Sequence, residues 1–364
     1  MQLKDLYSKV FLNQLSDQVQ KYDNNFDKTK FISACMDSDW DDLKLMERSD
    51  RIVESLHRQL PNEFKQASEI LRKIGPQFHG LAATCLPNYV AHYGLDDWEI
   101  SMRTLELLTQ YSSAEFAIRP FLVKYPTQTS QQMLEWSKST NVDVRRLASE
   151  GIRPRLPWGI RLKEYVKDPT VIFPILKNLI FDDSEYVQKS VANNLNDISK
   201  DNPQMVLDFV QRYRNQRKQT DWVISRGLRT LFKQGNPEVL DILGYDPKAS
   251  QWLKQIQFTT SNQQVIIGQT STMHYNVTAD FKREQALYLG YRVHYVRINK
   301  TDSYKDFFVK KTNLKANSFV KGDFKINWKQ LTTRKLYPGI HQIDLLVNTV
   351  AIASCQIDVL ENLE

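Results

Sequence analysis

The hydrophobic pattern of the chain changes its period once, near Phe258, and this change constrains the fold more than any other feature. Before about residue 253, apolar residues recur at the spacing of an α-helix, as in the run from Leu3 to Val19. After Phe258 they alternate strictly, as from Leu287 to Tyr295. The pattern predicts two domains, an all-α domain over residues 1–253 and an all-β domain over residues 258–364. The second has the length of an immunoglobulin-like sandwich, without the Cys…Trp…Cys frame of antibody domains.

The helical part carries a degenerate repeat. Prolines punctuate it at intervals from Pro61 to Pro237, and VRRLASEG, starting at Val144, lies 43 residues before VQKSVANN, starting at Val187. Helix starts of this kind recur at roughly 40-residue spacing in HEAT-type helical pairs. We therefore expect a HEAT-like superhelical solenoid with an extended concave face, the alternative being an irregular helical bundle.

Composition narrows the function classes. Lys plus Arg number 49 against 42 for Asp plus Glu, a net charge of +7 that mildly favours an anionic partner. The three cysteines are far apart and the N-terminus has no apolar leader, so we expect a cytoplasmic protein without disulfides or a membrane span. The six histidines form no HExxH or Cys/His cluster, and no GxxxxGK, GxGxxG or GxSxG occurs, so neither a metal nor another cofactor is expected.

Two carboxylates stand out in this setting. Glu150 lies in LASEG and Asp197 in ANNLND, and the 43-residue alignment places Glu150 over Asn193, one helical turn before Asp197. An offset of four residues keeps both acids on the same face. Each could instead be an ordinary surface acid, with Arg146 and Lys200 as the nearby basic partners. Their shared position in adjacent repeats favours a chemical role.

The surroundings of these acids are basic and carry one aromatic residue. Trp158 follows a Pro-Arg-Leu-Pro turn, where a tryptophan either fills a core or shields a cationic group. The density of arginine argues for phosphate contact rather than for a solvated face. The group comprises Arg145, Arg146, Arg153, Arg155 and Arg161, with Lys189, Asn193, Asn194 and Lys200 one repeat later.

Several long strings resemble one family, the AlkC-type DNA alkylation-repair glycosylases. They are SAEFAIRPFL from Ser113, RRLASEGIRPRLPW from Arg145, SEYVQKSVANNLNDISKDNP from Ser184 and TTRKLYPGIH from Thr332. The resemblance covers nearly the whole chain and includes the longer branch with an immunoglobulin-like domain. It implies a monofunctional N-glycosylase that removes cationic N3-alkylated bases, 3-methylcytosine and 3-methyladenine, from double-stranded DNA without a tight base-flipping pocket.

The resemblance also implies roles for residues. The catalytic acids of the family fall on Glu150 and Asp197, and its active-site tryptophan falls on Trp158. One string departs from the family, since Arg226 stands where members tend to have His, so its role as a DNA contact is open. Arg226, Arg229 and Arg334 complete the expected DNA-binding set, and the Lys residues of the second domain are candidates for a clamp on the DNA backbone.

Two rival functions stay open. The chain could be a non-enzymatic HEAT-like scaffold that binds nucleic acid or protein through its concave face, or an enzyme acting on larger adducts or RNA. The sequence does not decide between 3-methylcytosine and 3-methyladenine, nor which carboxylate dominates. We expect a monomer, because a solenoid that grips one duplex has no need to dimerise.

Overall fold

The computed structural model describes residues 2–297, 303–331 and 335–361. Contacts divide the chain into two compact units, Met1–Gly227 and Leu228–Glu364. The last helical segment ends at Trp252 and the first strand begins at Leu253. The second unit begins before this point, at Leu228, so it includes the last short helices as well as the strands. Arg334 lies outside the described residues.

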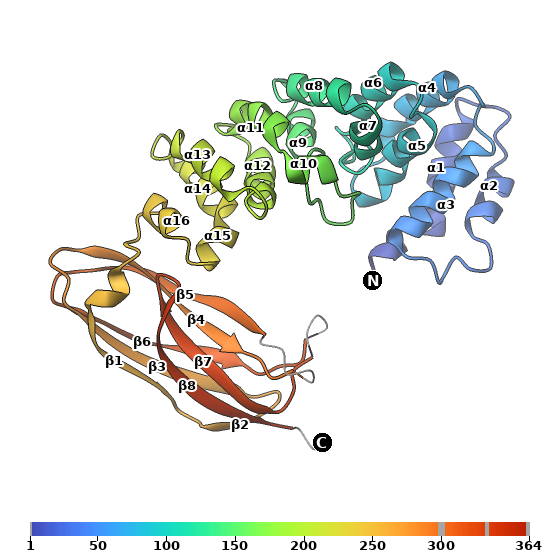
Figure 1. Ribbon diagram of the computed structural model, residues 1–364. Helices are drawn as coiled ribbons and strands as arrows, with labels where there is room; N and C mark the ends of the chain where they lie inside the picture. The colour runs from blue at the N-terminus through green and yellow to red at the C-terminus, as the bar shows by residue number, and fades with distance from the viewer. Residues whose placement is uncertain (1, 298–302, 332–334, 362–364) are drawn as a thin grey trace. The chain divides into compact units, whose positions relative to one another are not determined.

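The first unit is a succession of helices (Figure 1). Its α-helices are α1 (Lys9–Gln20), α2 (Lys28–Cys35), α3 (Leu45–His57), α4 (Phe64–Ile74), α5 (Cys85–Tyr93), α6 (Trp98–Leu108), α7 (Arg119–Lys124), α8 (Pro126–Trp136), α9 (Val142–Glu150), α10 (Lys163–Lys167), α11 (Phe173–Leu179), α12 (Glu185–Ile198), α13 (Pro203–Gln211) and α14 (Lys218–Gly227). Short 3-10 turns accompany them: η1 (Leu3–Leu6), η2 (Gly75–Gln77), η3 (Leu81–Thr84) and η4 (Thr170–Ile172).

The helices pair in the manner that the repeat predicted. α8 packs on α9, α11 on α12, and the second helices α9, α12 and α14 pack on one another in turn. Prolines start several helices, Pro126 in α8 and Pro203 in α13, where the missing N–H removes no intrahelical bond. The helix starts of α9 and α12 are 43 residues apart, as the alignment of the two strings requires. The HEAT-like part of the predicted fold is confirmed.

The second unit is a two-sheet sandwich preceded by short helices. Its strands form one sheet in the order β1-β3-β6 and a second in the order β2-β8-β7-β4-β5. The elements are α15 (Arg229–Lys233), α16 (Pro237–Ile242), η5 (Ala249–Trp252), β1 (Leu253–Thr260), β2 (Gln264–Ile266), β3 (Thr270–Ala279), β4 (Gln285–His294), β5 (Tyr304–Leu314), β6 (Phe319–Asn327), β7 (Gly339–Val347) and β8 (Val350–Leu360).

Strict alternation in the sequence becomes the core of this sandwich. Leu287, Leu289 and Val293 of β4 are fully buried, and the ring of Tyr291 on the same face stacks on Phe324 of the facing sheet with ring centroids 4.4 Å apart. The alternation predicted for β8 is only partly buried, because Ile357 and Val359 lie in the core whereas Ala351 is exposed. The immunoglobulin-like sandwich is confirmed.

Candidate active site

Helices α9 and α12 place the two carboxylates that the sequence singled out. The Asn141 side chain caps α9 by accepting hydrogen bonds from the first-turn amides, which sets where the helix begins. Glu150 is the last residue of α9, Asp197 lies one residue before the end of α12, and these two helices pack together. Both acids are buried, Glu150 at 5% exposure and Asp197 at 2%. Such burial rejects the interpretation of two ordinary surface acids, because an unpaired buried charge is costly.

One guanidinium joins the two acids. Arg153 donates from Nη1 to Glu150 Oε1 at 2.6 Å and from Nε to Asp197 Oδ2 at 2.8 Å. Its Nη2 lies 2.8 Å from the same Asp197 oxygen. Arg153 is itself only 7% exposed. In this structure it is therefore the bridge between the carboxylates, and a phosphate would have to compete with both acids for it.

Each acid has one further hydrogen bond from a neighbour. The Ser190 hydroxyl donates to Glu150 Oε2 at 2.6 Å, and the Lys200 ammonium donates to Asp197 Oδ1 at 3.1 Å. The Lys200 side chain is 38% exposed, so this oxygen of Asp197 is the one whose partner reaches solvent. Each carboxylate oxygen of the buried pair thus has a partner, and the Lys200 partner is partly exposed.

A third, partly buried carboxylate continues the network. Glu115 accepts from Arg146 Nη1, and Arg146 Nη2 lies 3.6 Å from Glu150 Oε1. Burial raises the pKa of Glu115, and the Arg146 guanidinium opposes that rise. The Arg146 guanidinium also lies over the Tyr186 ring, 4.9 Å from its centroid. Glu115, Arg146 and Tyr186, but not Glu150, line a cavity of about 310 Å³.

Sequence reasoning did not single out Glu115, Ser190 or Arg119, which holds the loop described next. All three lie inside strings that carried the family resemblance, in SAEFAIRPFL and SEYVQKSVANNLNDISKDNP. A matching string does not show which of its residues lie in the site, whereas their burial and hydrogen bonds in the structure do.

Trp158 lies on the loop between α9 and α10. Its φ is 64°, and the side chain is 69% exposed. A positive φ at a bulky residue costs on the order of 1–3 kcal/mol and persists only where the surroundings impose it. The core alternative for this tryptophan is therefore wrong: the loop displays the indole to solvent.

The remaining predicted DNA contacts differ in exposure. Asn194 is fully buried and donates to the Ser149 carbonyl at 2.8 Å, so it ties α12 to α9 and does not reach the surface. Arg145 is held by Asp182 at 2.6 Å. The others lie at the surface or partly buried: Arg155 paired with Asp201 at 2.6 Å, Arg161 exposed, Lys189 paired with Glu185 at 2.9 Å, Asn193 half-buried, Arg226 over the Trp222 ring at 5.7 Å, and Arg229 half-buried.

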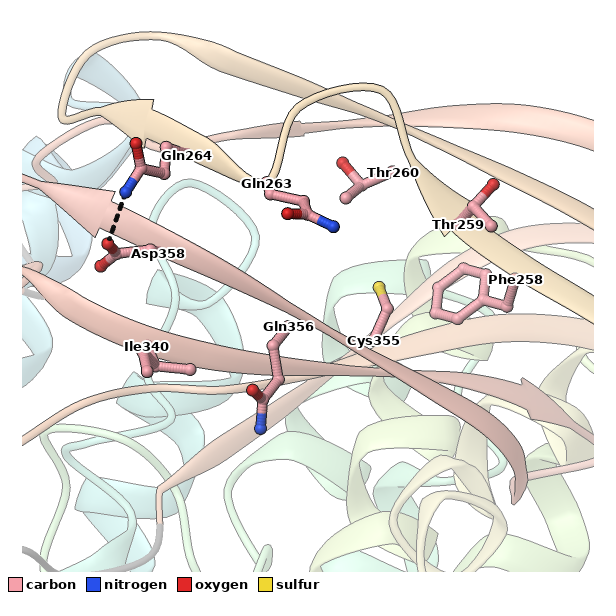
Figure 2. Close-up of a pocket in the computed structure, with 9 residues that line it drawn as sticks. All are labelled: Phe258, Thr259, Thr260, Gln263, Gln264, Ile340, Cys355, Gln356 and Asp358. Carbon is pink, nitrogen blue, oxygen red and sulfur yellow. Dashed lines mark hydrogen bonds between the residues drawn. The ribbon is translucent and has the colours of Figure 1, made fainter.

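The sandwich carries a separate groove of about 810 Å³ between β1 of one sheet and β8 of the other (Figure 2). Thr259, Thr260 and Gln356 contribute polar groups, and Gln264 donates to Asp358 at 3.2 Å. The residues that line it include one carboxylate and no Lys or Arg. The groove therefore lacks the paired acids and cations of the helical unit.

Within residues 2–297, 303–331 and 335–361, no group of three or more His, Cys, Asp and Glu side chains could hold a metal ion. No helix of the same ranges is long and apolar enough to span a membrane.

The chain thus combines a HEAT-like row of helices, which buries a bridged carboxylate pair, with an immunoglobulin-like sandwich. Two family models match these two parts. The model described as "DNA alkylation repair enzyme" matches residues 47–231. A second model, described as "Uncharacterised protein YhaZ, C-terminal Ig-like domain", matches residues 254–361. The chain belongs to the DNA alkylation repair enzyme family.

Two relatives locate the chain within that family. It is similar to the solved structure of Pseudomonas fluorescens alkylpurine DNA glycosylase AlkC bound to DNA containing an abasic site analog, with a TM-score of 0.93, 33% identity, and coverage of 99% of this chain and 100% of that one. It is also 38% identical over 346 residues to the uncharacterized protein YhaZ of Bacillus subtilis (strain 168), covering 95% and 96% of the two chains. The AlkC-type resemblance is confirmed along the whole chain.

Proposed function

We propose that this protein is a monofunctional DNA N-glycosylase of base excision repair, acting in the cytoplasm on alkylated double-stranded DNA. Its substrates are cationic N3-alkylated bases, 3-methylcytosine and 3-methyladenine, and it needs no tight base-flipping pocket. The observation that carries the proposal is the buried pair Glu150 and Asp197 on one arginine, whose loop also displays Trp158 to solvent. Its similarity over 99% of the chain to an alkylpurine DNA glycosylase bound to DNA supports it.

The reaction requires an ionised carboxylate rather than a general acid that protonates the leaving base. An N3-alkylated base already carries a positive charge, so the electron pair of the N-glycosidic bond neutralises it as the bond breaks. The sugar becomes an oxocarbenium-like cation, which a buried carboxylate stabilises strongly. Water then adds to C1′ and transfers a proton to a carboxylate, and the products are the free base and an abasic site.

We assign water positioning and cation stabilisation to Asp197, and stabilisation of the same charge to Glu150. Asp197 Oδ1 is the oxygen held by the half-exposed Lys200, so a cation arriving from solvent meets this oxygen first. Trp158 projects from the adjacent loop and would cover a cationic nucleotide. Arg153 keeps both acids in place from behind.

DNA is held by the basic residues of the set that reach solvent, above all the exposed Arg161, Lys189 and Arg226, with the partly exposed Arg155 beside them in the set. Counterion release makes such binding fall steeply with salt. One protein molecule suffices for one duplex. Lysines of the sandwich contribute a second contact to the DNA backbone. In this proposal the glycosylase domain comprises residues 1–253 and the immunoglobulin-like domain residues 258–364.

The test is release of free base from methylated duplex DNA by the native protein, D197N and E150Q, with DNA binding measured in parallel. The matched control is D208N, which removes an exposed acid on α13 that accepts a hydrogen bond from Gln204. We expect native protein and D208N to release base, and the two site variants to bind DNA without releasing it. Strand cleavage should not follow base release. Equal DNA binding with no release by any of the four would establish the scaffold alternative instead.

A further inference from the structure

Arg119, at the start of α7, is a fully buried cation. Its side chain has 0% exposure, and no carboxylate of the described residues forms an ion pair with it. Burial first, and the neighbouring Arg153 charge second, lower the pKa of Arg119 to about 10. A cation in such a place is tolerated only where it makes hydrogen bonds that the fold needs.

Those hydrogen bonds all go to one loop. Arg119 donates from Nη1 to the carbonyls of Gly151 and Arg153 at 2.7 and 2.9 Å, and from Nε to the carbonyl of Ile160 at 2.6 Å. The loop from 151 to 160 contains two prolines and no regular helix or strand. One guanidinium therefore ties the beginning of the loop to its end, where a backbone ladder is missing.

The loop passes directly over the arginine at Gly159. A Cβ added there would lie 3.1 Å from Arg119 Cδ and 3.2 Å from its Nε, closer than ordinary contacts. Gly159 immediately follows Trp158, whose backbone has the strained positive φ. The clamp thus acts next to the residue whose conformation most needs to be imposed.

The same loop supplies the bridge between the acids. The carbonyl of Arg153 accepts from Arg119, while its guanidinium holds Glu150 and Asp197. A shift of the loop would move the arginine bridge and the exposed indole together. We propose that Arg119 is a positioning residue, which sets Trp158 and Arg153 in register with the two carboxylates by clamping the 151–160 loop from beneath. This inference rests on the proposed glycosylase function for its effect on rate.

The experiment compares R119K and R119M with R48K in the full chain. Arg48 is a matched control, because it is also buried and donates to the backbone carbonyls of Trp40 and Lys4, outside the site. Lysine keeps the charge but gathers its donors on one nitrogen, so it does not reproduce the separate Nη1 and Nε donors, and methionine removes every donor. If R119M fails to fold, R119K carries the test.

Two readouts separate positioning from general stability. The first is the single-turnover rate of base release at saturating methylated DNA, measured with the dissociation constant. We expect R119K to lose about 10- to 100-fold in rate, as small misplacements do, with DNA affinity within about twofold. The second is hydrogen exchange of the amides of residues 151–162, expected to quicken in R119K and to stay native in R48K. R48K should release base at the native rate.

The outcomes are distinct. R119K with a native rate and native loop exchange would overturn the proposal, as would an equal loss of rate in R48K. If the native protein itself releases no base, the proposed function fails, and the clamp is then judged by loop exchange alone: quickened exchange in R119K supports it, and unchanged exchange refutes it.

Discussion

Replacing Arg153 by methionine should destabilise the helical unit by about 3–5 kcal/mol, the usual loss when one partner of a buried ion pair is removed. The reason is the burial of what remains. Glu150 and Asp197 are 5% and 2% exposed, and without Arg153 they keep only the Ser190 hydroxyl, the more distant Arg146 and the partly exposed Lys200. Two buried carboxylates would then lack the cation that they share.

The chain contains a matched control for this change. Arg155 joins the same loop to Asp201, just beyond α12, through two hydrogen bonds of 2.6 Å. The two side chains are 28% and 26% exposed, so water replaces the lost bonds in R155M. We expect that variant to lose only about 0–1 kcal/mol, as exposed pairs do. Both arginines link to an aspartate between the same segments, and Arg153 also holds Glu150, so the contrast combines burial with the second buried acid.

Urea unfolding followed by far-ultraviolet circular dichroism, which reports mainly on the helices, measures both changes. The double variant R153M/D197N completes a cycle, because removing Asp197 as well relieves part of the uncompensated charge. We expect the double variant to be more stable than the sum of the single losses predicts. Equal losses in R153M and R155M, within about 0.5 kcal/mol, would refute the argument from burial.

Four further outcomes follow from the described contacts. W158G should raise stability by up to about 1 kcal/mol in urea unfolding, because glycine accepts the positive φ and the indole is mostly exposed, while base release falls. R161A should weaken DNA binding for all sequences and lower the slope of log affinity against log salt by about 1. Burial, with Asp344 second, raises the pKa of Cys355 to about 11, so its alkylation in the groove of Figure 2 should quicken about tenfold per pH unit up to that value. Burial opposes ionisation of Asp344, but three side-chain hydrogen bonds outweigh it and lower the pKa of this carboxyl. The folded state therefore binds fewer protons than the unfolded state, and the stability from Asp344 is lost as pH falls below about 4. D344N should lack this loss in an acid titration followed by circular dichroism.

The features that could be read from the sequence are those with a local cause. Helical and alternating patterns depend on which residues lie a few positions apart, so a helical part followed by a β-sandwich could be predicted. The shared setting of Glu150 and Asp197 was also predictable, because a repeat transfers position from one helix pair to the next.

The partners of these acids could not be read in the same way. Arg145, Arg153 and Arg155 form one cluster in the sequence, yet Arg145 binds Asp182, Arg155 binds Asp201, and Arg153 turns inward. The difference arises from the direction of a loop with two prolines, which no periodicity describes. Arg119 is harder still, since its partners are backbone carbonyls, which every residue has.

The network that results alternates in charge along its whole length. Glu115, Arg146, Glu150, Arg153, Asp197 and Lys200 follow one another through contacts of 3.6 Å or less. Every internal member faces opposite charges on both sides, which is how so many ions can lie in one interface. The last member of this network is Lys200, a flexible side chain that is 38% exposed, and not another buried arginine. In the proposed reaction a sugar cation takes over the role of that ammonium at Asp197, so the negative charge is prepared beforehand and the buried part of the network need not rearrange.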